Sequence, residues 1–180
     1  MLQTDALDHA QGPERAEVTL VEYGDFECIY CETAFTVVKR LQKEFSGQLK
    51  FVFRHFPLRQ LHPDAQLAAE AAEAAGAQSR FWEMHDALFR NQNRLDSESL
   101  SIYASELGLD VARFDAALAS HVYAERVHQH FRGGLREGVS GTPTFFVNGV
   151  KHEGDWSYEV LANAIRRAIK AVRAARHVAA

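Results

Sequence analysis

The stretch that decides the fold is VTLVEYGDFECIYC, residues 18–31. The β-branched and aromatic side chains of residues 18–23 predict a buried strand. Gly24 and Asp25 end that strand. After Cys28, apolar residues recur at helical spacing, at positions 34, 35, 38, 41 and 45. This pattern predicts a helix that begins at a Cys-x-x-Cys pair and ends near Ser46 and Gly47.

The position of Cys28 at a helix N-terminus has chemical consequences. The unpaired backbone N–H groups and the positive end of the helix dipole stabilise negative charge there. We therefore expect Cys28 to have a lowered pKa and to be the nucleophile, because the thiolate is the reactive form. Cys31 lies one turn further along and can close or resolve a disulfide.

Length, composition and charge narrow the function classes. The 180 residues suit one domain with an inserted lobe, and 47% hydrophobic residues can bury a full core. A formal net charge of −4 gives no sign of nucleic-acid binding. The only two cysteines lie three positions apart, which indicates redox chemistry rather than a disulfide-stapled scaffold.

The chain shows neither a signal peptide nor a membrane-spanning stretch. Residues 1–17 have no cationic start and no apolar core, and no run of 18 apolar residues follows. The sequence as it stands predicts a cytoplasmic location, or a periplasmic or extracellular one if a signal has been removed.

The order of elements predicts an α/β core interrupted by helices. Residues 1–16 are expected to form a flexible N-terminal arm. A second strand is expected at residues 49–56, where Leu49, Phe51 and Phe53 alternate with Lys50, Val52 and Arg54, and Pro57 stops it. Two strands joined by a helix of this length should be parallel.

The middle of the chain, residues 61–138, predicts an inserted helical subdomain. Asp64, Ser97 and Asp110 are expected to open three of its helices, and residues 121–135 to form the last. The sheet resumes after Thr142, with Asn148-Gly149 as a two-residue hairpin turn. A last helix after Ser157 completes a core of residues 17–60 and 139–176. Its basic face is interpreted as solvated, with cations complementing the helix dipole.

Four motifs, taken in this order, resemble the DsbA-like branch of the thioredoxin fold. They are YGDFECIYC, FRHFPL, AAEAAGAQSRFWEMHDALF and VSGTPTFFVNG. The resemblance implies a thioredoxin fold with an all-helical insertion, and a thiol-disulfide oxidoreductase. It also implies that Pro143 is cis and lies beside the disulfide, since X-Pro bonds tolerate cis at low cost. Thr142 would then offer its backbone to an extended thiol-containing peptide. An ordinary proline that opens a strand is the alternative.

The resemblance also assigns roles to other residues. Glu22 matches a buried acid of thioredoxin-like proteins, which could exchange a proton with Cys31. An outward-facing Glu22 on an edge strand is the alternative. Phe26, Tyr30 and the backbone of Gly141 would line the surface that contacts substrate.

Two departures from the strongest oxidases predict an intermediate reduction potential. Ile29 and Tyr30 separate the cysteines, where those enzymes have Pro-His, and Thr142 replaces their Val. Such an enzyme would need neither a metal nor an organic cofactor, because the disulfide carries two electrons. Its partners would be protein thiols or disulfides and a recycling partner that the sequence does not name. The direction of electron flow and the oligomeric state stay open.

Three other functions were considered. A structural zinc site needs two more ligands, and the nine histidines contain no pair at the spacing that completes Cys₂His₂. His121, His128 and His130 are interpreted as surface residues of a helix. A redox-independent holdase would bind peptides on the same fold without the cysteines. A glutathione-dependent enzyme typically has Ser or a lone Cys at the first position, which the intact pair disfavours.

Overall fold

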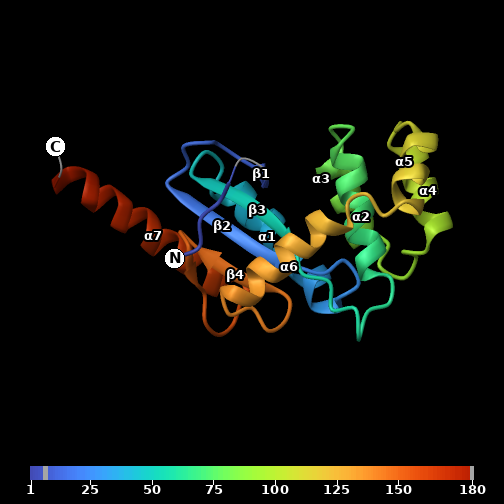
Figure 1. Ribbon diagram of the computed structural model, residues 1–180. Helices are drawn as coiled ribbons and strands as arrows, with labels where there is room; N and C mark the ends of the chain where they lie inside the picture. The colour runs from blue at the N-terminus through green and yellow to red at the C-terminus, as the bar shows by residue number, and fades with distance from the viewer. Residues whose placement is uncertain (6–7, 179–180) are drawn as a thin grey trace. The chain divides into compact units, whose positions relative to one another are not determined.

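The computed structural model describes residues 1–5 and 8–178, and the chain divides into two compact units (Figure 1). The first unit consists of Met1–Tyr23, Thr33–Arg54 and Pro143–Ala180. The second consists of Gly24–Glu32 and His55–Thr142. The second unit contains more of the chain than the predicted insertion at residues 61–138, because the loop that carries Cys28 also belongs to it.

A five-stranded sheet forms the centre of the first unit, in the order β1-β3-β2-β4-β5. The pairs β1/β3, β2/β4 and β4/β5 are antiparallel. The strands are β1 (His9–Gln11), β2 (Val18–Gly24), β3 (Leu49–His55), β4 (Thr144–Val147) and β5 (Val150–Lys151). This arrangement, with the helical insertion between β3 and β4, is the predicted thioredoxin fold of the DsbA-like type.

Strand β3 is buried along almost its whole length, because it lies between β1 and β2 inside the sheet. The alternation in its sequence does not mark an exposed face. Val52 is fully buried and Arg54 is 8% exposed. A strand covered on both faces needs apolar residues at consecutive positions, which explains the run from Phe51 to Phe53.

The expectation of a flexible arm at residues 1–16 is wrong for the segment around β1. His9 pairs with Phe53, and Gln11 with Phe51. The guanidinium of Arg54 donates two hydrogen bonds of 2.8 Å to the carboxylate of Asp8. A buried cation requires a paired anion, and this polar segment supplies one. Residues 6 and 7 of the expected arm lie outside the described residues.

Helices α1 (Ile29–Glu44) and α7 (Tyr158–Val178) begin where the sequence predicts. Helix α7 contacts β4 and buries one stripe. The predicted hairpin between β4 and β5 is confirmed: Asn148 and Gly149 both have positive φ, 48° and 77°, as its tight turn requires. Among the described residues, no helix combines the length and apolar character needed to cross a membrane.

Five helices make up most of the second unit, and α2 contacts each of the other four (Figure 1). Its alanines are buried and allow close approach of the neighbouring helices. The helices are α2 (Ala65–Gly76), α3 (Phe81–Arg90), α4 (Ser97–Glu106), α5 (Val111–Ala119) and α6 (Ala124–Arg136).

The first residues of these helices show which of the predicted N-terminal caps form. The carboxylate of Asp110 accepts from the N–H of Arg113, as expected of a cap. Asp96, one residue before the predicted Ser97, caps α4 by accepting from the N–H of Ser99. Asp64 stands at the start of α2 but makes no side-chain cap hydrogen bond.

Candidate active site

Cys28 directly precedes α1, and Cys31 lies in the first turn of that helix. The N–H of Cys31 donates to the carbonyl oxygen of Cys28 at 2.9 Å, which closes the turn between them. The two residues are buried, with 4% and 0% of their surface exposed, and the structure holds them as a dithiol. The predicted placement of the pair at a helix N-terminus is therefore confirmed.

The environment lowers the pKa of Cys28 from an ordinary value of 9.0 to about 5. The largest cause is a hydrogen bond from the side chain of Cys31 to the sulfur, which burial partly opposes. The neighbouring Thr142 and hydrogen bonds from the backbone N–H groups of Tyr30 and Cys31 lower the pKa further. These amides belong to the helix N-terminus, as the sequence predicted.

Thr142 lies against the sulfur of Cys28 although 114 positions separate the two residues. The Sγ of Cys28 donates to the backbone oxygen of Thr142 at 3.4 Å. Next to Thr142, a Cβ added at Gly141 would meet nothing within 4 Å, so the backbone there is open on that side. The geometry thus brings together Cys28 and Thr142, the residue that precedes Pro143, while the cis form of Pro143 stays a prediction.

Asp25 organises the loop before Cys28, a role that the sequence did not reveal. One oxygen of its buried carboxylate accepts from the N–H of Glu27 at 2.8 Å. The other accepts from the N–H of Leu58 and from Nδ1 of His62, both at 2.8 Å. The Asp25 backbone oxygen accepts from the N–H of Cys28 at 3.2 Å. An aspartate inside a motif that also ends a strand could have suggested this role, but its partners Leu58 and His62 lie more than 30 positions away in the sequence.

Two further contacts hold the same loop. Gln92 donates through Nε2 to the backbone oxygens of Phe26 at 2.8 Å and Cys28 at 3.0 Å. The carboxylate of Glu27 accepts from the N–H of Asp64 at 2.8 Å. Gln92 follows α3 in the helical insertion, and nothing in its local sequence distinguishes it from a surface residue. The insertion therefore positions the backbone around Cys28.

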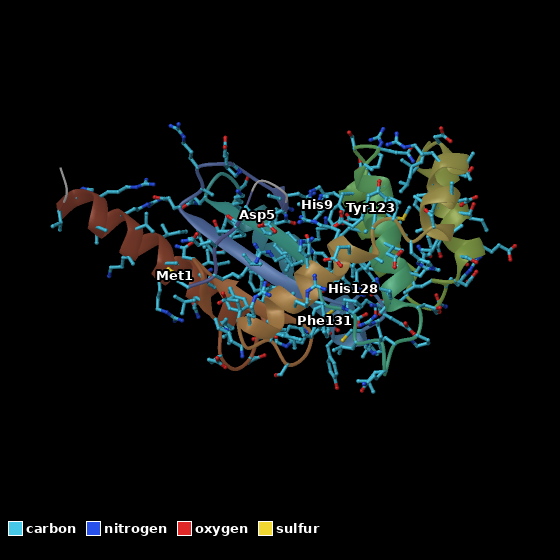
Figure 2. The ribbon with its side chains drawn as sticks, in the orientation of Figure 1. Met1, Asp5, His9, Tyr123, His128 and Phe131 are labelled. Carbon is cyan, nitrogen blue, oxygen red and sulfur yellow. The ribbon has the colours of Figure 1, made fainter. Side chains whose placement is uncertain are left out.

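The segment that supplies Leu58 and His62 is held in turn by α6. Figure 2 shows His128 and Phe131 on this helix. The ring of Phe131 stacks on that of Phe56 with 4.4 Å between centroids. Nη1 of Arg59 lies 3.2 Å from Nε2 of His128. The partners of Asp25 thus come from a segment that is fixed at several points.

The residues expected to contact substrate separate into buried and exposed ones. Phe26 is only 1% exposed, so the expectation that it lines the contact surface is wrong. Its ring packs against those of His55, His85 and Phe89, with centroids 4.9–5.9 Å apart. Tyr30, by contrast, is 64% exposed, as is its neighbour Ile29 at 66%. These two large, exposed side chains between the cysteines are accessible to an incoming chain.

Glu22 is buried, with 2% of its surface exposed. It pairs with Phe145 across β2 and β4, in a strand that lies inside the sheet. The alternative of an outward-facing residue on an edge strand is therefore wrong. Its exchange of a proton with Cys31 stays a prediction.

The second unit also contains a buried cluster that the sequence did not predict: His55, Glu73 and His130. Their potential ligand atoms lie within 4.8 Å of one another. Nε2 of His55 is 2.9 Å from a Glu73 oxygen, and the N–H of His55 donates to Nδ1 of His130 at 3.2 Å. A His₂Glu set suits Zn²⁺, but only after the His55–Glu73 hydrogen bond is broken. His130 is 6% exposed, so its interpretation as a surface residue is wrong.

Comparison with known proteins gives a family and a fold. A family model described as thioredoxin matches residues 4–167. The crystal structure of oxidised BdbD from Bacillus subtilis superposes with a TM-score of 0.83 at 24% identity, covering 89% of this chain and 92% of that one. A thioredoxin-like oxidoreductase from Silicibacter pomeroyi gives 0.82 at 27% identity, covering 92% and 94%. Wolbachia pipientis alpha-DsbA1 gives 0.84 at 20% identity, covering 96% of each chain.

Curated relatives bear a different name. The Na(+)/H(+) antiporter NhaA 1 of Salinispora arenicola is 48% identical over 166 residues, which are 92% of this chain and 25% of that protein. The antiporter NhaA of Herminiimonas arsenicoxydans is 41% identical over 167 residues, or 93% and 26%. The chain thus spans about a quarter of the length of these relatives, and the transport activity in their names is said of them alone.

Proposed function

Because the chain belongs to the thioredoxin family and has the fold of its DsbA-like members, we propose that it is a thiol-disulfide oxidoreductase acting on proteins. The observation that carries this proposal is the sulfur of Cys28, whose pKa is lowered to about 5 and which lies 3.4 Å from the backbone oxygen of Thr142. A sulfur that is stable as a thiolate is both a ready nucleophile and a good leaving group.

The proposed oxidation of a substrate dithiol begins with the pair as a disulfide. A substrate thiolate attacks the Cys28 sulfur, a mixed disulfide forms, and Cys31 leaves and takes a proton, which Glu22 supplies. The second substrate thiolate then attacks the first substrate sulfur, which is bonded to Cys28 in the mixed disulfide. The substrate leaves as a disulfide, its two electrons remain on the pair, and Cys28 is released as a thiolate. Reduction of a substrate is the same sequence in reverse, with Cys31 as the resolving thiol.

The position of Thr142 and Pro143 supports a protein as the substrate. Pro143 has no N–H, so a neighbouring chain would pair with the backbone of Thr142 next to the Cys28 sulfur. The open side of Gly141 and the exposed ring of Tyr30 would accommodate that chain. We propose no metal or organic cofactor for this reaction, since the disulfide itself carries the electrons.

The pKa of Cys28 supports a potential between the extremes of the superfamily. Nucleophilic cysteines have pKa values of about 7 in thioredoxin and about 3.5 in the strongest oxidases, with reduction potentials of about −270 and −120 mV. A pKa of about 5 favours oxidation or isomerisation of substrates. Equilibration with glutathione buffers would measure the potential, and a strongly oxidising value would argue against the cytoplasmic location predicted from the sequence.

Two serine variants test the mechanism. Cys28→Ser should abolish oxidation of a dithiol peptide. Cys31→Ser should trap the mixed disulfide that forms when the Cys28 thiolate attacks a disulfide-bonded peptide and releases one of its sulfurs as a thiolate, and a non-reducing gel or mass spectrometry detects this species. Retained oxidation in Cys28→Ser would contradict the proposal. The trapped species should form on Cys28 and disappear in the double variant.

A redox-independent holdase is the second candidate, and the exposed apolar side chains of Ile29 and Tyr30 favour it. It would bind unfolded chains without thiol chemistry. Suppression of aggregation of a cysteine-free unfolded protein, unchanged in Cys28→Ser, would support the holdase. Loss of that effect in Tyr30→Ser would place the binding surface between the cysteines.

A further inference from the structure

The buried carboxylate of Asp25 presents an electrostatic problem for the proposed chemistry. It lies three residues before Cys28, and the backbone of Asp25 is hydrogen-bonded to the N–H of Cys28. A nearby like charge disfavours a thiolate. Yet this carboxylate accepts from the backbone N–H groups of Glu27 and Leu58 and lies 2.8 Å from Nδ1 of His62, a pattern that suits the ionised form. A compensating cation is therefore needed at this place.

His62 is placed to be that cation. Its Nδ1 is 2.8 Å from Asp25, and its side chain keeps 22% of its surface exposed, so it can exchange protons with water. Burial disfavours the charged ring, but the hydrogen bond with Asp25 and the negative charges of Asp25, Cys28 and Glu27 outweigh burial and raise the pKa of His62.

The basic side chain closest to His62 in the sequence is engaged elsewhere. Arg59 contacts His128. The backbone N–H of Asp64 donates to the carboxylate of Glu27. The charges that act on His62 from the Cys28 loop are thus all negative, and a protonated ring balances them.

We propose that protonated His62, held in place by Asp25, supplies the positive charge that offsets the Asp25 carboxylate and so stabilises the Cys28 thiolate, with His62 taking up a proton when the Cys28–Cys31 disulfide is reduced. His62 is a positioning residue in this scheme, and it replaces the histidine that the Ile29-Tyr30 dipeptide lacks. The inference rests on the proposed redox function of the pair.

The protons and electrons balance in this scheme. A substrate dithiol gives two electrons and two protons as it becomes a disulfide. The electrons break the Cys28–Cys31 bond. One proton goes to the sulfur of Cys31, and the other goes to His62 instead of to Cys28. Because coupling between two sites is reciprocal, His62 should hold its proton more tightly in the reduced protein than in the oxidised one.

His62→Asn is the direct test, since the amide nitrogen of Asn can still donate to Asp25 but has no charge. The readout is the pKa of Cys28 in the reduced protein, followed by thiolate absorbance, which needs no substrate. We expect His62→Asn to raise that pKa by about one unit and to lower the equilibrium constant for reduction by glutathione about tenfold. His62→Lys, which restores a cation, should return both toward wild type. His177→Asn, an exposed change near the end of α7, should alter neither.

Two results would overturn the inference. One is a folded His62→Asn variant in which the acid dissociation constant of Cys28 and the equilibrium constant for reduction by glutathione both stay within twofold of the wild-type values. The other is an NMR titration of the wild-type protein in which His62 has the same pKa in the oxidised and reduced forms. The titration needs no variant, so misfolding of His62→Asn leaves it valid. Failure of the redox function itself would appear separately, as a wild-type protein that does not oxidise dithiol peptides.

Discussion

The side-chain amide of Gln92 donates to the backbone oxygen of Cys28 at 3.0 Å and to that of Phe26 at 2.8 Å. The helical insertion thereby supplies a direct support for the backbone that carries the nucleophile. A residue that makes such hydrogen bonds fixes the geometry of a reactive group although it does not itself contact the substrate.

Gln92→Ala should weaken this support. We expect a loss of about 1–2 kcal/mol in the free energy of unfolding, because two backbone oxygens lose their donor. Amide hydrogen exchange at residues 27–31 should become faster. Gln129→Ala is the control, since Gln129 donates to the exposed side chain of Glu125. An equal effect of both variants on stability and exchange would contradict the assigned role.

The lowered pKa of Cys28 predicts how the stability of the reduced protein depends on pH. The folded thiol titrates at about 5 and the unfolded one near its ordinary value of 9.0. Between these values the folded state binds fewer protons, so stability rises with pH. This contribution is complete above about 9 and is lost as the pH falls through about 5. Thermal melts of reduced wild type and Cys28→Ser should diverge across this range, and parallel curves would refute the shift.

The backbone pattern of the chain was largely predictable from local sequence. Strand β2, the start of α1 and the hairpin at Asn148-Gly149 follow from residue preferences that act over a few positions. The motif order was enough to place Cys28 and Thr142 together, and the structure brings them to 3.4 Å.

What could not be predicted depends on partners that are distant in the sequence. Strand β1 is short and polar, and it is ordered by pairing with β3 and by Arg54, which no local pattern reveals. The roles of Asp25 and Gln92 arise from contacts across 37 and 64 positions. His130 was interpreted as a surface residue because the helical pattern of the sequence does not show which polar side chains are buried. It is the hydrogen bond from the N–H of His55, 75 positions away, that explains its burial.

The pair of Asp8 and Arg54 gives a test of the ordered N-terminal segment. Asp8→Asn leaves the Arg54 guanidinium buried beside a neutral group, and removing one partner of a buried pair costs about 3 kcal/mol. Glu83→Gln breaks the exposed pair with Arg80 and should cost less than about 1 kcal/mol. Urea unfolding measures both. A cost below about 1 kcal/mol for Asp8→Asn would indicate that the segment is loosely held after all.

Phe26 and Tyr30 should separate stability from substrate binding. Phe26→Ala removes a ring packed among aromatic neighbours and should cost about 3–5 kcal/mol of stability. The milder Phe26→Leu should retain folding and leave the KM for a dithiol peptide unchanged. Tyr30→Ala removes an exposed ring, so it should raise KM with little change in stability. A Phe26→Leu variant with wild-type stability and a raised KM would indicate that Phe26 does contact the substrate.

Glu22→Gln tests whether the buried carboxyl exchanges a proton with Cys31. The amide has nearly the same shape but cannot carry a proton back and forth, so the step in which Cys31 attacks or leaves should slow about 100-fold. The first attack at Cys28 should keep its rate, because Cys28 is stabilised by Cys31, Thr142 and backbone amides instead. Stopped-flow measurement of the formation and decay of the mixed disulfide separates the two steps. Glu98→Gln, an exposed change in the first turn of α4, is the matched control. Equal decay rates in wild type, Glu22→Gln and the control would show that water, and not Glu22, exchanges the proton with Cys31.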